Sequence, residues 1–202
     1  MSLRLGVVMD ALDTVQFKKD STLAMLWEAQ ARGYALYYFQ QKDLYVKNKM
    51  PYGMAQALRV SKDPNNWYHL DAPQEITLDS LDVMLMRKDP PFNDNYIYST
   101  YLLEQAERAG VLVVNRPQAL RDANEKLFTL YFPDCCPETL VSQSIDKLQD
   151  FWHEQQDIVC KPLNAMGGTS IFRLKVNDVN ANVEAVVTKI VAANASIVSV
   201  LA

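Results

Sequence analysis

The segment CKPLNAMGGTSIF, residues 160–172, places a lysine and two adjacent glycines between two apolar runs. The whole chain has six glycines, so the pair Gly167–Gly168 needs a physical reason. Glycines let backbone N–H groups approach a ligand closely, and a loop between two strands can lay such groups over a phosphate. Lys161 would add a positive charge at the same phosphates. The segment is neither a Walker A nor a GxGxxG motif, because no helix is expected after the loop. A plain hairpin turn with a solvated Lys161 fits the same pattern.

A second set of polar residues follows the apolar run of residues 82–86. Arg87, Lys88 and Asp89 stand where a core strand should end, and two prolines come directly after them. Ligands of open α/β sheets bind outside the carboxyl ends of the strands, and an arginine there can hold a carboxylate with two hydrogen bonds. A charged strand end followed by a rigid turn is the alternative interpretation.

A third set lies on one short predicted helix and consists of Arg121, Asp122, Asn124 and Lys126. A lysine in this position can bind an anion, although a charge run on a helix is usually a solvated face. The two histidines are isolated, and no nucleophile motif accompanies them. No catalytic residue is therefore assigned from the pattern.

The elements that must position these residues alternate between strand and helix. Apolar runs predict strands over 4–10, 34–39, 81–87, 111–115, 157–163 and 169–175. Helical periodicity predicts helices over 20–34, 94–110, 117–132 and 145–155, and a helical start within 182–202. Residues 44–60 read as an inserted hairpin around Pro51 and Gly53, and residues 63–80 as a loop. The order predicts an α/β fold with a parallel sheet, divided into units 1–122 and 123–202.

Composition narrows the class of protein. The 202 residues are 49% hydrophobic and 22% charged, with a net charge of −4, which argues against nucleic acid as a partner. No apolar stretch is long enough to span a membrane, and the first residues lack the apolar region of a signal peptide. Three cysteines without disulfide or metal spacing indicate reduced thiols and a cytoplasmic location.

Taken in order, six segments resemble bacterial glutathione synthetase, a family of the ATP-grasp superfamily. They are LGVVMD, KKDSTLAMLWEAQARGY, DVMLMRKDPPF, VVNRPQALRDANEKLF, PETLVS and KPLNAMGGTSIFR, and the match runs from about Arg4 to about Lys175. The resemblance implies an N-terminal substrate domain of the pre-ATP-grasp type over 1–122. Over 123–202 it implies the first α+β lobe of an ATP-grasp domain, apparently truncated, with a tail that diverges after Lys175.

The resemblance also implies a function. It implies a ligase that uses ATP and Mg²⁺ to join γ-glutamylcysteine to glycine through an acyl phosphate, and a homo-oligomer. The residues that match the family's ATP-binding positions are Lys126, Lys161, Asn164, Met166, Gly167, Gly168 and Thr169. Arg87, Lys88 and Asp89 match the segment that faces the substrate cleft.

The end of the chain departs from the family pattern. After Gly168 the acidic residues are Asp178 and Glu184, and neither stands in the family's metal motif. No metal ligand is therefore expected within this chain, and the 202 residues alone are expected to be inactive. The alternatives are a non-catalytic fragment that binds a nucleotide or a peptide, and an α/β interaction domain without a ligand.

Overall fold

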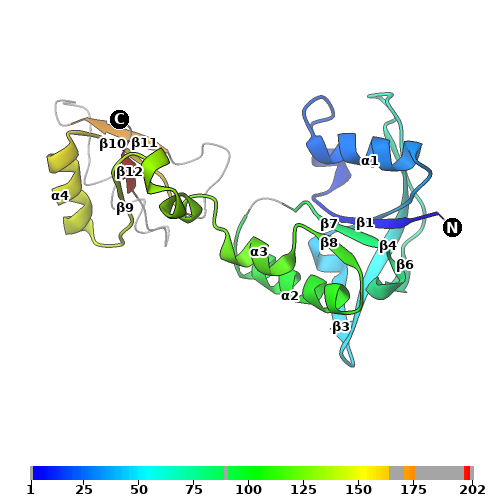
Figure 1. Ribbon diagram of the computed structural model, residues 1–202. Coiled ribbons are helices and arrows are strands. Elements are labelled where there is room, and N and C mark those ends of the chain that lie inside the picture. Colours follow the sequence, from blue (N-terminus) through cyan, green and yellow to red (C-terminus); the bar gives the residue numbers. More distant parts are fainter. Residues whose placement is uncertain (1, 89–90, 164–170, 176–197, 201–202) are drawn as a thin grey trace. The chain divides into compact units, whose positions relative to one another are not determined.

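The computed structural model describes residues 2–88, 91–163, 171–175 and 198–200. The chain divides into two compact units, Met1–Asp122 and Ala123–Ala202, and each is considered by itself (Figure 1).

The first unit is built on a mixed eight-stranded sheet. Its parallel part has the order β2-β1-β7-β8, formed by Ala35–Phe39, Arg4–Val8, Val83–Met86 and Leu112–Val114. The antiparallel part is organised by β4, which pairs with β2, β3, β5 and β6. These strands are β3 (Leu44–Lys47), β4 (Met50–Val60), β5 (Tyr68–Leu70) and β6 (Gln74–Thr77). The parallel sheet predicted from the sequence is confirmed, with an antiparallel extension.

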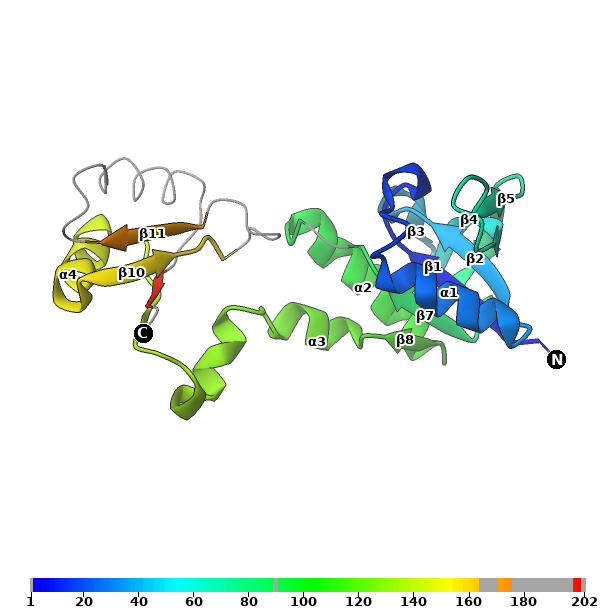
Figure 2. The ribbon, with the colours of Figure 1, turned by 90° about the horizontal axis from the view of Figure 1, so that it is seen from above.

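Helices cover both faces of this sheet (Figures 1 and 2). Helix α1 (Ser21–Ala31) buries Leu23 and Leu26 in the core on one face. Helices α2 (Asp94–Arg108) and α3 (Pro117–Asp122) lie on the other face, where α2 buries Leu103. The Asp20 side chain caps α1 by accepting a hydrogen bond from the Leu23 N–H at 2.8 Å. Short 3₁₀ helices follow β1, β2 and β6, at Leu12–Thr14, Gln41–Asp43 and Leu78–Ser80.

Two local predictions in the first unit need correction. The hairpin of residues 44–60 turns at Asn48 and Lys49, whose φ angles are 51° and 69°, while Pro51 and Gly53 lie within β4. Residues 63–80, predicted as a loop, contain β5 and β6. The cause is the length of β4, because its first half pairs with β3 and β6 and its second half with β2 and β5. Such short partner strands carry too few residues to show an alternating pattern.

The second unit packs helix α4 (Ile145–Gln155) on an antiparallel sheet of order β11-β10-β12-β9. Its strands are β9 (Thr139–Leu140), β10 (Asp157–Cys160), β11 (Phe172–Lys175) and β12 (Val198–Val200). Leu148 of α4 is buried against Ile158 and Leu174. The helix predicted over 145–155 and the two strands predicted around the glycine loop are confirmed. The predicted helical start within 182–202 lies outside the described residues apart from β12.

The helix predicted over 117–132 is not continuous. It ends at Asp122 and is followed by 3₁₀ helices at Leu127–Tyr131 and Pro133–Cys135. The Asn124 side-chain oxygen accepts hydrogen bonds from the N–H groups of Lys126 and Leu127, at 3.0 and 3.1 Å. An asparagine side chain that bonds to the N–H groups of nearby residues competes with the hydrogen bonds of an α-helix, which explains the break.

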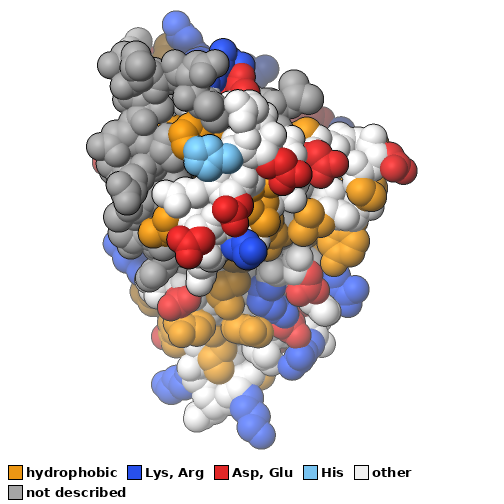
Figure 3. All heavy atoms as spheres, turned by 90° about the vertical axis from the view of Figure 1, so that its left-hand side faces the viewer, with side chains coloured by type: hydrophobic (Ala, Val, Ile, Leu, Met, Phe, Trp, Pro, Cys, Tyr) orange, Lys and Arg blue, Asp and Glu red, His pale blue; other side chains and the backbone are white. Residues whose placement is uncertain are grey.

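The surface agrees with the modest net charge. On the face drawn in Figure 3, acidic and basic side chains are interspersed with hydrophobic ones among the described residues. None of the helices in this part of the chain has the length and apolar character that a membrane span requires.

Candidate functional site

The connection between β10 and β11 holds the first group of predicted residues. The two strands pair antiparallel, and Cys160 opposite Phe172 is the last pair before the connection. Lys161 is therefore the first residue to leave the sheet. The predicted glycine-loop residues Asn164, Met166, Gly167, Gly168 and Thr169 lie outside the described residues.

Lys126, which directly precedes the 3₁₀ helix Leu127–Tyr131, also contacts this connection. Its ammonium nitrogen lies 3.3 Å from the Leu163 carbonyl oxygen, two residues beyond Lys161, and 2.7 Å from a Glu125 carboxylate oxygen. The side chain is only 17% exposed, and the Asn124 bonds described above fix its backbone. The structure thus brings Lys126 to the segment that begins with Lys161, although 35 positions separate the two lysines in the sequence.

The Lys161 side chain is half-buried, and among the described residues no hydrogen bond or ion pair engages its ammonium group. An ammonium group in this condition keeps its three donors for an anion. Cys160, directly before it, is buried, and burial raises the pKa of its thiol to about 11. That thiol stays protonated at neutral pH, so Cys160 is a packing residue and no nucleophile.

The second group of predicted residues lies at the carboxyl ends of β1 and β7. A pocket of about 280 Å³ opens there. It is lined by Met9, Asp10, Thr14, Val15, Gln16, Lys19, Asp20, Thr22 and Arg87.

Arg87 directly follows β7, and it lines this pocket. Its backbone N–H donates to the Val8 carbonyl at 2.8 Å, which continues the pairing of β7 with β1 by one residue. Its guanidinium donates from Nε to the Thr22 hydroxyl and from Nη2 to the Ser21 hydroxyl, both at 3.0 Å. The two hydroxyls of the first turn of α1 therefore hold the Arg87 guanidinium near the carboxyl ends of β1 and β7.

Lys88 does not line the pocket itself but contacts a residue that does. Its ammonium lies 2.6 Å from Oδ1 of Asp10, and its side chain is 16% exposed. Asp10 lines the pocket, whereas Lys88 is absent from the lining. A pocket thus lies where the cleft was predicted, and Arg87 lines it. Lys88, which was also predicted to line the cleft, pairs with Asp10 instead. Asp89 lies outside the described residues.

The other polar residues of this pocket, above all Asp10, Lys19 and Asp20, were not predicted from the sequence. Asp10 carried a usable signal, because it follows β1 and parallel neighbours end at the same edge of a sheet. Lys19 and Asp20 come from the turn before α1, and nothing in their spacing points toward β7.

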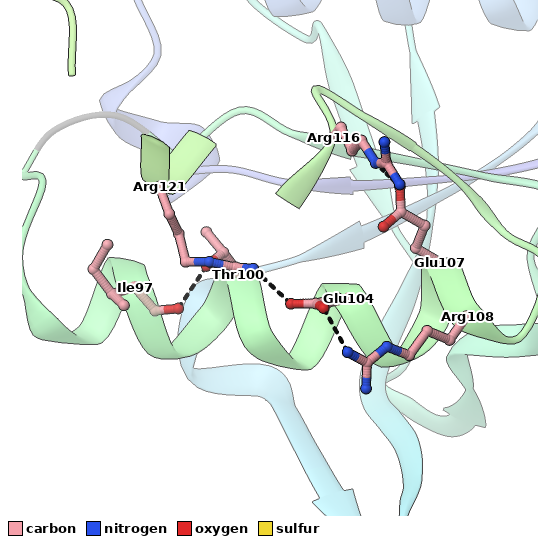
Figure 4. A network of polar contacts seen from close by, with 7 residues as sticks. All are labelled: Ile97, Thr100, Glu104, Glu107, Arg108, Arg116 and Arg121. Carbon is pink, nitrogen blue, oxygen red and sulfur yellow. Dashed lines mark hydrogen bonds and ion pairs between the residues drawn. The ribbon is translucent and has the colours of Figure 1, made fainter. Parts of the chain in front are cut away.

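The third predicted group is divided between the units. Arg121 belongs to α3 and turns to α2, where it donates to Thr100 at 3.0 Å and to Glu104 at 2.6 Å (Figure 4). Lys126 belongs to the second unit. Each of these two residues therefore has its contacts within its own unit.

The described residues offer little to a metal ion. No group of three or more His, Cys, Asp or Glu side chains in that part of the chain could hold one. All three cysteines are free thiols.

Comparison with known proteins covers nearly the whole chain. The model of the prokaryotic glutathione synthetase N-terminal domain matches residues 3–121, and the model of the prokaryotic glutathione synthetase ATP-grasp domain matches residues 125–200, past Lys175. Glutathione synthetase of Pseudomonas aeruginosa is 55% identical over 183 residues, which are 91% of this chain and 58% of that protein. Glutathione synthetase of Buchnera aphidicola is 47% identical over 91% of this chain and 57% of its own length. The chain thus spans a little over half the length of these relatives.

Solved structures support the fold. D-cycloserine synthetase DcsG matches 98% of this chain and 59% of its own with a TM-score of 0.61 at 14% identity. A RimK domain ATP-grasp protein from Sphaerobacter thermophilus matches 98% of this chain and 63% of its own with a TM-score of 0.57 at 16% identity. At this level of identity the two structures support the ATP-grasp fold and nothing beyond it.

Proposed function

The chain belongs to the prokaryotic glutathione synthetase family, and we propose that the protein acts as an ATP-dependent ligase that joins γ-glutamylcysteine to glycine. In the proposed reaction, the γ-phosphoryl group of ATP moves to the C-terminal carboxylate of the dipeptide and forms an acyl phosphate. The amine of glycine then attacks the acyl carbon, phosphate leaves, and a peptide bond forms. A cytoplasmic, homo-oligomeric enzyme is part of this proposal.

Lys126 and Lys161 have the proposed role of holding the ATP phosphates. The observation that carries this proposal is the contact of the Lys126 ammonium with the Leu163 carbonyl, which puts both lysines at the connection after β10. Two cations at the phosphates would offset the negative charge on the transferred group. The glycine loop of residues 164–169 would add backbone N–H donors and exclude water from the acyl phosphate.

Mg²⁺ belongs to the proposal as the companion of ATP, but the described residues do not fit it. They provide no cluster of carboxylates. We therefore assign no step of the reaction to the metal ion.

Nucleotide titration tests this assignment. Isothermal titration of the chain with ATP and Mg²⁺ should give a Kd that rises about 10- to 100-fold in Lys161→Met, because hydrogen bonds to a charged group contribute about 1.5–3 kcal/mol. Lys147→Met is the matched control, since Lys147 lies exposed on α4. Equal affinity of wild type and Lys161→Met would contradict the proposed phosphate site.

A second measurement separates a ligase from a non-catalytic nucleotide-binding protein. Phosphate release is followed with ATP, Mg²⁺, γ-glutamylcysteine and glycine, and then with each substrate omitted. Release that requires both amino-acid substrates supports the ligase. Nucleotide binding without any release fits both the non-catalytic alternative and the expected inactivity of these 202 residues alone.

A further inference from the structure

We propose that Cys135 and Cys136 form a redox site, at which a low-molecular-weight disulfide oxidises the two neighbouring thiols to one intrachain disulfide. Oxidation then loosens the segment that joins Lys126 to the pair. The thiol chemistry does not depend on the proposed function, whereas its effect on nucleotide binding rests on the role proposed for Lys126.

The three cysteines differ in their access to solvent. Cys135 is exposed, Cys136 is half-buried, and Cys160 is buried in β10. Thiol–disulfide exchange requires a thiolate to reach a sulfur of the incoming disulfide, so its rate depends on access. Burial also raises the pKa of the Cys160 thiol to about 11, which keeps that thiol protonated. Cys135 is therefore the cysteine that a disulfide in solution meets first.

Cys136 has the position of a second, resolving thiol. Its Sγ atom lies 3.5 Å from the Thr129 carbonyl oxygen, to which the thiol donates a weak hydrogen bond. The residue also lines a pocket of about 220 Å³. The other lining residues are Thr129, Leu130, Pro133, Pro137, Glu138 and Thr139. The sulfur thus has open space beside it and only a weak bond to break before it moves toward Cys135.

Two exchange steps oxidise the pair. The Cys135 thiolate attacks a disulfide R–S–S–R, a mixed disulfide forms, and one R–S⁻ leaves and takes up a proton. The Cys136 thiolate then attacks the Cys135 sulfur, forms the bond between the two residues and expels the second R–S⁻, which also takes up a proton. The pair loses two hydrogen atoms with their electrons, and one small disulfide is reduced to two thiols.

A disulfide between sequence neighbours is easily reversed. Consecutive Cα atoms are about 3.8 Å apart across a trans peptide bond, whereas the usual Cα separation of a disulfide is about 4.4–6.8 Å. The resulting strain makes such a bond easy to reduce, and labile disulfides of this kind are the regulatory ones. The pair should therefore oxidise only where small disulfides are abundant, and a monothiol should restore it.

Hydrogen bonds connect Cys136 to Lys126. The Thr129 carbonyl accepts from the Cys136 thiol and from the Phe132 N–H, the latter at 2.9 Å. The Thr129 hydroxyl donates to the Lys126 carbonyl at 2.6 Å. A disulfide sulfur carries no hydrogen, so oxidation removes the bond to Thr129 and draws Cys136 toward Cys135. The 3₁₀ helix that follows Lys126 loses this support.

Mass spectrometry after incubation with hydroxyethyl disulfide tests the two steps. The wild-type chain should lose two hydrogen atoms and carry no adduct, and mercaptoethanol should reverse the change. Cys136→Ser should stop at the mixed disulfide and keep one hydroxyethylthio group on Cys135, while Cys135→Ser should react much more slowly. Cys160→Ala is the matched control and should behave like the wild type, because Cys160 is buried.

Hydrogen exchange of the nucleotide-free chain tests the effect on the segment. Oxidation should speed exchange of the Phe132 and Cys136 amides about 2- to 10-fold, which corresponds to the loss of one hydrogen bond. Amides of α4 should not change. Cys135→Ser treated in the same way is the control, since it cannot form the disulfide.

A stable adduct on Cys135 of the wild type, a disulfide between two chains, or unchanged exchange at Phe132 would overturn the inference. A reaction seen with oxidised glutathione but not with hydroxyethyl disulfide would also overturn it, because recognition of a peptide would then be required. None of these measurements uses ATP, so they stand apart from the proposed nucleotide site. An oxidised pair with a loosened segment and unchanged ATP affinity would support the redox site and contradict the role proposed for Lys126.

Discussion

The pKa of the Cys160 thiol shows how strongly burial can change the chemistry of one residue. Cys160 closes β10 with a side chain that is 1% exposed, and the residue after it is the proposed phosphate ligand Lys161. Burial disfavours the charged thiolate and raises the thiol pKa from its usual value near 9 to about 11. Exposed Cys135 has no such environment.

This difference predicts a pH dependence of stability. Between about pH 9 and about pH 11 the unfolded chain loses the Cys160 proton while the folded chain keeps it. The unfolded state is therefore favoured as pH rises, and the free energy of unfolding should fall by up to about 1.4 kcal/mol per pH unit in that window. Urea denaturation at pH 8 and pH 10.5 measures the change. Cys160→Ala should lose this part of the pH dependence and Cys135→Ala should keep it; identical pH profiles for both variants would show that burial does not control this thiol.

At the scale of elements, the contact between α2 and α3 depends on Arg121. Its side chain is 14% exposed and donates to Glu104 and Thr100 (Figure 4). Its guanidinium also lies 4.3 Å from the centre of the Tyr101 ring. The pKa of Glu104 is lowered, mainly by the hydrogen bond from Arg121. Arg116 offers a comparison, because its ion pair with Glu107 leaves the arginine 72% exposed.

Arg121→Met should therefore destabilise the first unit by about 1.5–3 kcal/mol, and Arg116→Met by no more than about 1 kcal/mol. Urea denaturation in a Trp152→Phe background measures the effect, since the remaining tryptophans, Trp27 and Trp67, both belong to the first unit. Glu104 contributes stability above its ordinary pKa and loses it as pH falls through its lowered value. The difference between wild type and Arg121→Met should therefore shrink in acid. Equal effects of the two arginine variants would contradict this account.

The same elements show how far the sequence predicts the structure. Long periodic segments such as 94–110 and the valine-rich strands were predicted correctly, because one buried face dominates their pattern. Gly53 was misread as part of a turn. Gly53 lies within β4. A Cβ at this position would come within 2.6 Å of the Phe39 ring, so the close packing of the two strands requires a glycine here. That requirement comes from a residue 14 positions away and leaves no local signal.

The residues of the candidate site also differ in whether the sequence could predict them. The sequence indicated Arg87 and Lys161 because each stands at the end of an apolar run, whereas Lys126 was indicated by the family resemblance. Lys19 and Asp20 reach the pocket because the turn before α1 folds toward the end of β7. The ion pair between Lys88 and Asp10 likewise depends on how the ends of β7 and β1 pack together. Contacts of this kind are created by tertiary packing, which a linear pattern does not carry.

At the scale of the whole molecule, each unit closes its own core. Leu103 and Leu23 belong to cores of the first unit, and Leu148 belongs to a core of the second. Each unit also holds one of the two candidate sites, the pocket beside Arg87 for the dipeptide and the connection after β10 for ATP. A ligand that binds the folded state stabilises the part of the structure it contacts, and local opening of that part then becomes rarer.

Hydrogen exchange should therefore respond to the two ligands in different places. ATP with Mg²⁺ should slow exchange of backbone amides in β10 and at Lys126, and γ-glutamylcysteine should slow exchange at Met9, Arg87 and the first turn of α1. Lys161→Met should remove the first effect and keep the second, whereas Arg87→Gln should do the opposite. Each variant thus serves as the control for the other, because both keep one site intact in the same chain. Protection that spreads evenly over both units with either ligand would contradict the division, since it would mean that the two units open together and that neither ligand acts through the residues assigned to it.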